Sequence, residues 1–396
     1  MRIRPIIAAG AIICLTLTGC TGAKPAGNTP QTGEAVQDQG TKPEETPAQS
    51  EKAEPEKEEA KPEKAEETAP AAKSATTESC DLFSITLPED MAGVYVVETD
   101  SNRISVFEKE AKDAGFGGFA FGVAAYKEPS EYYGGMDRKV GEFTASDGTL
   151  YDIVIDYPSD VQFDYEKYAE EVPVNYDRLY QGAEDAVKTL AGADGKGSFV
   201  WGGGTKGEDL YQDVLEKFRT AIKEGWDANR LEAEDMSSMY YVISSSGEGN
   251  GADKIGYAYY DTNNDGIDEL LVGEIAEDDW KGTVYDIYTM ADRKPMHVVS
   301  GWDRNRYYAL EDGFIVNEYS GGADESGWNV FDIEPNTGRI MDQVDFKIDG
   351  YENKDKPWFI SYDEGETWEN VTEEEFEERM ETFKNYKRFD FTPLSK

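Results

Sequence analysis

A long segment that cannot build a hydrophobic core sets the main limit on how this chain can fold. Residues 21–79 are rich in Pro, Glu, Lys, Ala, Thr and Gln, with PEKEEAKPEKAEE at their centre, and contain almost no aromatic or branched apolar residues. Such a segment buries too little apolar surface to offset the entropy of an ordered chain, and its recurring prolines disfavour a continuous helix. We therefore expect a disordered linker over residues 20–79, with the folded structure after it.

The first twenty residues have the pattern of an export leader. Arg2 and Arg4 precede an apolar run over residues 6–17, which is shorter than the roughly 20 residues that a membrane-spanning helix needs. The run ends in LTGC, which resembles the lipobox of bacterial lipoproteins of the Gram-positive, Firmicutes type. The resemblance implies a signal peptide over residues 1–19, acylation of the Cys20 thiol, and a mature chain anchored at the extracytoplasmic face of the cell membrane.

The charge of the chain restricts its partners. Acidic residues outnumber basic residues 82 to 39, which gives a formal net charge of -43. Nucleic acids are bound chiefly through Lys and Arg, so this charge excludes a nucleic-acid partner. The remaining candidates are the membrane, reached through the lipid anchor, and a cell-wall component, a glycan or another protein as ligand.

Few residues are available for nucleophilic or thiolate chemistry. Cys80 is the one cysteine of the folded part and His297 is the one histidine of the chain. These counts exclude an internal disulfide and a zinc site built from histidines or thiolates. A Ser-His-Asp site would need His297, which lies in the apolar run PMHVV and is interpreted as a strand residue. We assign no catalytic residue and predict that the protein is not an enzyme.

Hydropathy patterning predicts an α+β fold with two small, mostly antiparallel-sheet domains and packed helices. Apolar positions recur at helical spacing over residues 176–190, 210–222 and 372–383, and the last begins with a capping box formed by Thr372 and Glu375. Alternating or short apolar runs predict strands at residues 83–87, 94–97, 104–107, 115–123, 151–155, 239–244, 255–260, 284–290, 306–310, 314–319, 329–333 and 344–348. We place the domains at residues 80–200 and 201–396.

One constellation carries recognisable chemistry. The sequence DTNNDGIDEL, residues 261–270, places oxygen ligands at alternate positions around a glycine that permits a sharp turn. Calcium requires about six to eight oxygen ligands. An EF-hand would have Glu at its twelfth position, where this chain has Val272, and the flanking segments are strand-like. A metal-free turn rich in Asn, Asp and Gly is the alternative interpretation.

The loop resembles the strand-loop-strand calcium motif of FG-GAP and VCBS repeats. That resemblance implies that calcium is bound by Asp261, Asn263, Asp265, the carbonyl of Ile267 and Glu269. The region after the loop is similar to a module of exported Firmicutes lipoproteins. This likeness supports the predicted extracytoplasmic location and the predicted fold, and it implies no substrate. The motif occurs once, whereas a propeller would repeat it.

These observations favour a cell-surface-anchored, non-catalytic binding or structural lipoprotein with a structural calcium site. The alternative is an extracellular hydrolase that uses paired carboxylates on wall or host glycans. A carbohydrate platform could be formed by the aromatic residues Trp302, Tyr307, Tyr308, Trp328 and Trp358, and the alternative interpretation places these residues in the core. A solute receptor would need two large lobes with parallel sheets, against which the hairpin signals argue.

Overall fold

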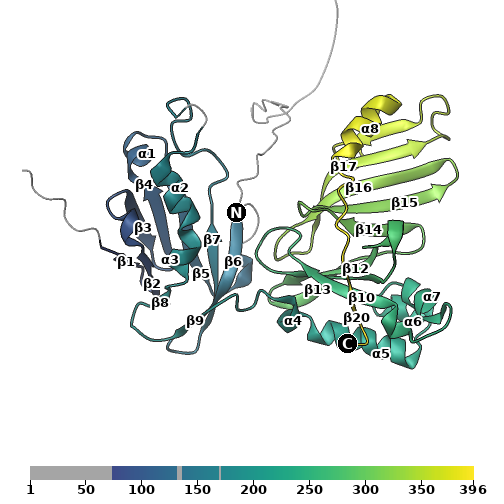
Figure 1. Ribbon diagram of the computed structural model, residues 1–396, viewed down its shortest axis with the longest axis horizontal. Helices are drawn as coiled ribbons and strands as arrows, with labels where there is room; N and C mark the ends of the chain where they lie inside the picture. Colours follow the sequence, from purple (N-terminus) through teal and green to yellow (C-terminus); the bar gives the residue numbers. More distant parts are fainter. Residues whose placement is uncertain (1–73, 132–135, 169–170) are drawn as a thin grey trace, which may run out of the picture. The chain divides into compact units, whose positions relative to one another are not determined.

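The computed structural model describes residues 74–131, 136–168 and 171–396 (Figure 1). The signal peptide, Cys20 and residues 21–73 of the linker lie outside the described residues, so the leader, the anchor and this part of the linker stay predictions. The end of the predicted disordered linker is wrong, because residues 76–79 form a strand. None of the described helices is long and apolar enough to cross a bilayer.

The first part of the described chain forms two antiparallel sheets. Strands β1 (Thr76–Ser79), β2 (Phe83–Leu87) and β8 (Ala191–Gly192) pair in the order β1-β2-β8. The other sheet has the order β3-β4-β5-β7-β6-β9, formed by β3 (Tyr95–Asp100), β4 (Arg103–Glu108), β5 (Phe119–Tyr126), β7 (Leu150–Asp156), β6 (Asp137–Thr144) and β9 (Ser198–Trp201). A hairpin with its turn at Asp147-Gly148 joins β6 to β7.

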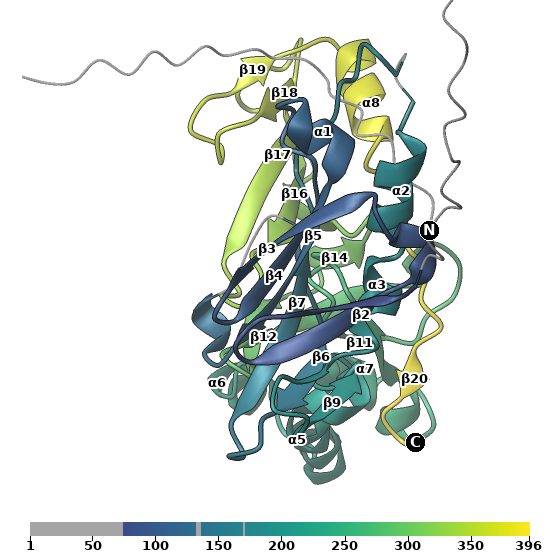
Figure 2. The same ribbon diagram turned by 90° about the vertical axis from the view of Figure 1, so that its left-hand side faces the viewer.

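Short helices cover the core of this part. Helix α2 (Val174–Gln181) packs on β4 and β5, and α3 (Ala183–Val187) packs on β2 (Figure 2). The sequence predicts one helix here, but Gly182 separates the two pieces. A Cβ at Gly182 would meet the end of the Met91 side chain, which would have to move to make room for it. Helix α1 (Lys109–Asp113) follows β4.

The second part is built on one long antiparallel sheet. Among the described residues, ten strands follow the order β19-β18-β17-β16-β15-β14-β12-β11-β10-β20, and β13 (Lys294–Ser300) pairs with β12 beside this path. The strands are β10 (Ile255–Tyr260), β11 (Glu269–Glu274), β12 (Val284–Ala291), β14 (Asn305–Ala309), β15 (Ile315–Gly322), β16 (Glu325–Ile333), β17 (Ile340–Asp349), β18 (Trp358–Ser361), β19 (Glu369–Asn370) and β20 (Thr392–Pro393).

Helices flank both ends of this sheet. Helix α4 (Gly207–Leu210) leads into α5 (Gln212–Glu224), which with α6 (Ala228–Ala233) and α7 (Met239–Ser245) shares a core with β11 and β12 (Figure 1). Helix α8 (Glu373–Glu381) contacts β18. Helix α5 stops at Gly225, which has φ 67°, and the predicted capping box of α8 is confirmed.

The predicted fold class is wrong. Strand accounts for 38% of the structure and helix for 22%. The described residues form three antiparallel sheets and belong to one compact unit. Two small α+β domains are therefore not formed. The strands of the second part from β10 to β20 join into one long sheet, and the two sheets of the first part belong to the same compact unit. The boundary between residues 200 and 201 stays a prediction.

The predicted strand at residues 239–244 is also wrong, because this segment is helix α7. Tyr240 and Ile243, three residues apart, are the buried pair of that helix, and the Tyr240 ring packs edge-on against Phe218 of α5. A short apolar run is compatible both with the alternating pattern of a strand and with the repeat of a helix, and here burial against α5 favours the helix.

Candidate metal centre

The calcium-type loop connects two paired strands, as its sequence predicts. Strands β10 and β11 are antiparallel neighbours, and the last pair before the loop is Tyr260 with Glu269. Gly266 has φ +88°, a left-handed conformation that side chains other than glycine rarely adopt. The strand-loop-strand geometry is thus confirmed, while occupancy by calcium remains a prediction.

Alternate side chains of the loop fold back over their own backbone. Asp261 Oδ2 accepts a hydrogen bond from the Gly266 N–H at 3.1 Å, and Asn263 Oδ1 accepts from the Asp265 N–H at 3.1 Å. Asp265 Oδ1 accepts from the Ile267 N–H at 2.8 Å. These bonds use part of the acceptor capacity of each oxygen and hold the three side chains in position.

Glu269 is the most constrained of the predicted ligands. Its side chain is fully buried, and Oε2 accepts from the Thr262 N–H at 2.7 Å and the Thr262 hydroxyl at 2.8 Å. Its other oxygen, Oε1, accepts from the Thr289 hydroxyl at 2.9 Å. Glu269 therefore has less free acceptor capacity than the aspartates, and its clearest role is to close the base of the loop.

Three carboxylates of the loop repel one another in a region with little water. Burial raises the pKa of Asp261 to about 6. Burial and then the Asp261 charge raise the pKa of Asp265, and burial and then the Asp265 charge raise the pKa of Glu269. Neighbouring like charges of this kind are stabilised by a bound divalent cation.

The donor set is suited to calcium, although the described residues contain no preassembled group of three or more His, Cys, Asp or Glu side chains placed to hold a metal. Asp261 Oδ1 is buried and has no hydrogen-bond partner. A buried, unpaired carboxylate oxygen costs free energy unless a cation or donor meets it. Calcium would draw on the oxygens of Asp261, Asn263 and Asp265, with main-chain carbonyl groups and water completing its shell.

The loop also joins the two parts of the fold. The Lys139 N–H, on β6, donates to the Asp265 carbonyl at 2.6 Å. The Asp268 N–H donates to the Thr205 carbonyl at 3.0 Å, and Asp268 Oδ2 accepts from the Gly207 N–H at 3.0 Å. The sequence gives no signal for these contacts, because they join residues more than sixty positions apart.

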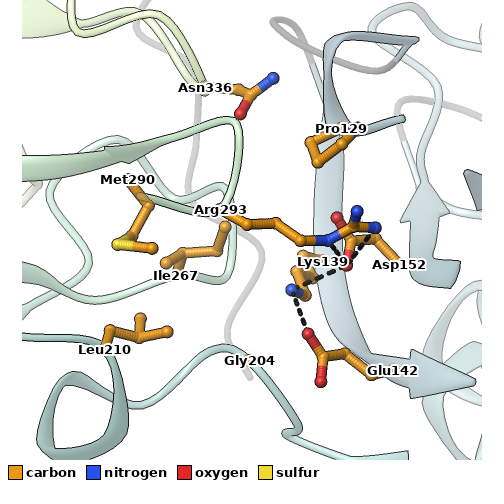
Figure 3. Close-up of a pocket in the computed structure, with 10 residues that line it drawn as sticks. All are labelled: Pro129, Lys139, Glu142, Asp152, Gly204, Leu210, Ile267, Met290, Arg293 and Asn336. Atoms are coloured by element: carbon orange, nitrogen blue, oxygen red, sulfur yellow. Dashed lines mark hydrogen bonds and ion pairs between the residues drawn. The ribbon is translucent and has the colours of Figure 1, made fainter. Parts of the chain in front are cut away.

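A buried charge network lies beside the loop (Figure 3). Asp152 Oδ1, on β7, lies 2.9 Å from Lys139 Nζ and 3.2 Å from Arg293 Nη2. Lys139 Nζ is also 3.2 Å from Glu142 Oε1. Ile267 of the loop lines the same cavity of about 130 Å³. The network was not foreseen from the sequence, where none of these residues belongs to a motif.

His297 is placed differently from a catalytic histidine. Its Nε2 lies 2.9 Å from Asp286 Oδ1 and 3.1 Å from Ser300 Oγ, and the Ser300 hydroxyl itself donates to Asp286. In a nucleophilic triad the serine and the carboxylate contact different ring nitrogens. His297 is on strand β13 as predicted, and the sharing of one nitrogen argues against a serine nucleophile here.

Searches of family models, curated proteins and solved structures found no match to this chain.

The close approach of the loop to β6 gives a first prediction. A Cβ at Gly266 would collide with the Lys139 carbonyl oxygen and force a side chain into left-handed backbone. We expect Gly266→Ala to lower the free energy of unfolding by about 2 kcal/mol, measured by urea denaturation. Gly148→Ala is the control, because Gly148 also has positive φ, +84°, but no atom lies near its Cβ position. Equal losses for the two variants would contradict the contact with β6.

Proposed function

We propose that this protein is a non-catalytic binding or structural module, tethered to the outer face of the cell membrane through Cys20, in which calcium fixes the junction between its two parts. The buried, unpaired Asp261 Oδ1 carries the calcium part of this proposal. The leader sequence, which ends in LTGC, supports the anchor. The glycan hydrolase alternative stays a prediction that no geometric observation favours.

The role of calcium follows from the contacts of the loop. The loop contacts β6 through the Asp265 carbonyl and the 205–207 connection through Asp268. A cation held by the carboxylates of Asp261 and Asp265 would replace their repulsion by attraction and stiffen the backbone between them. The main chain of Asp265, which accepts the hydrogen bond from Lys139 on β6, would then be fixed, so calcium would stabilise the junction as well as the hairpin.

The membrane anchor is tested by one substitution. Cys20→Ser removes the thiol that would be acylated. In a Gram-positive host we expect the native chain to be recovered in the membrane fraction with a mass that includes acyl groups, and the variant to lose both properties. Cys14→Ser is the control, because Cys14 lies inside the apolar run. Unchanged mass and membrane retention in the Cys20 variant would disprove the anchor.

A further inference from the structure

A second cavity, of about 470 Å³, opens on the long-sheet part of the molecule, away from the calcium-type loop. The connection between α6 and α7 forms one wall, and the end of β13 with the turn after it forms the other. Its polar and aromatic lining includes Glu232, Asp235, Ser237, His297, Ser300 and Trp302. The volume lies within the range of about 300 to 1,000 Å³ that is usual for small-molecule sites.

A buried carboxylate holds the two walls together. Asp286 is fully buried on β12, where Oδ2 accepts from the Ser237 N–H at 2.9 Å and Oδ1 contacts His297 and Ser300. The Ser237 hydroxyl donates to the Gly301 carbonyl at 2.6 Å. The polar groups of the cavity are therefore pre-positioned. Because Nε2 of His297 faces Asp286, Nδ1 is the ring nitrogen that remains for a ligand.

Trp302 presents an aromatic surface at this cavity. Its backbone exchanges two hydrogen bonds with Asn305, at 2.7 and 2.8 Å, which fix the turn, yet 51% of the residue is exposed. The other four members of the aromatic platform considered from the sequence serve the core: Tyr307 and Tyr308 are buried, and Trp328 and Trp358 pack against the core beside α8. Trp302 therefore brings an exposed aromatic side chain to a cavity lined largely by polar groups, where a ligand can stack on its ring.

The lining selects the chemistry of the ligand. It contains two carboxylates and no lysine or arginine, which disfavours anionic ligands. Carboxylates, serine hydroxyls and an imidazole offer many acceptors to a ligand rich in hydroxyl donors. One indole can stack on the C–H face of a sugar ring, whereas a cationic ammonium group is usually enclosed by several aromatic rings. We propose that this cavity binds a neutral saccharide, with Trp302 as the stacking surface, and this proposal rests on the binding-module part of the proposed function.

The test compares two matched tryptophan variants of the full-length protein on an array of neutral glycans, followed by calorimetry with each oligosaccharide retained. We expect the native chain to retain at least one neutral saccharide, and Trp302→Ala to weaken that binding about tenfold or more. Trp280→Ala is the control, because Trp280 is 49% exposed but does not line this cavity, and its binding should equal that of the native chain.

Three outcomes would overturn the proposal. The first is that no neutral glycan is retained. The second is saccharide binding that Trp302→Ala leaves intact. The third is that the chain binds choline or spermidine in place of sugars and that Trp302→Ala abolishes this binding. Each measurement is made in calcium and again in EDTA. Saccharide binding without any calcium uptake would uphold this site and refute only the calcium part of the proposed function, so the two failures are distinguishable.

Discussion

Replacing Asp152 by alanine is expected to lower the free energy of unfolding by about 3 to 5 kcal/mol, because it removes the shared carboxylate of a buried charge network. The side chains of Asp152 and Lys139 are 1% and 3% exposed, and Arg293 reaches the same carboxylate from the turn after β12. Without Asp152, the ion pair that remains for Lys139 is the longer one with Glu142, and Arg293 keeps its hydrogen bond to the Lys127 carbonyl.

The measurement is urea denaturation, with an exposed ion pair as control. Asp113 lies 2.5 Å from Lys109, but their side chains are 63% and 49% exposed, so Asp113→Ala should cost about 0.5 kcal/mol or less. Combining Asp152→Ala with Lys139→Met should recover part of the loss, since the double change removes the buried lysine along with the carboxylate that it faces. A loss for Asp152→Ala no larger than that of the control would show that the network does not stabilise the junction.

Calcium is expected to raise the stability of the native chain by about 2.7 kcal/mol when its concentration is one hundred times the dissociation constant. Asp265→Asn should lose most of this calcium-dependent gain in stability. The amide keeps an oxygen acceptor for the Ile267 N–H but removes one of three mutually repelling carboxylates. In EDTA this variant should therefore be at least as stable as the native chain, and in calcium it should gain little.

Differential scanning calorimetry in calcium and in EDTA measures both effects. Asp268→Asn is the matched control, because Asp268 lies in the same loop but outside the predicted ligand set, and the amide oxygen can still accept from the Gly207 N–H. The control should keep the calcium-dependent rise in melting temperature. A rise of equal size in Asp265→Asn would show that calcium acts elsewhere.

The local features of the fold were predictable from the sequence, and the long-range ones were not. Gly266 and the strand-like flanks indicated the hairpin, and Thr372 with Glu375 indicated the start of α8, because these signals act over a few residues. The joining of hairpins into one sheet depends on contacts between whole strands. No sequence period encodes such contacts, and the predicted pair of small α+β domains was wrong for that reason.

The same distinction holds for the sites. The loop oxygens follow from their spacing, whereas the contact of Asp265 with Lys139 and the network around Asp152 join distant segments. Asp286 did leave a signal: it is a lone carboxylate inside the apolar strand Val284–Ala291. A buried acid in such a run needs partners, and those partners turn out to be His297, Ser300 and Ser237.

Titration of calcium into the full-length protein by isothermal calorimetry tests most directly whether the 261–269 loop is a metal site. We expect one calcium ion bound per chain, with binding abolished in Asp265→Asn and retained in Asp268→Asn. No calcium uptake by the native chain, or equal uptake by the native and Asp265→Asn chains, would contradict it.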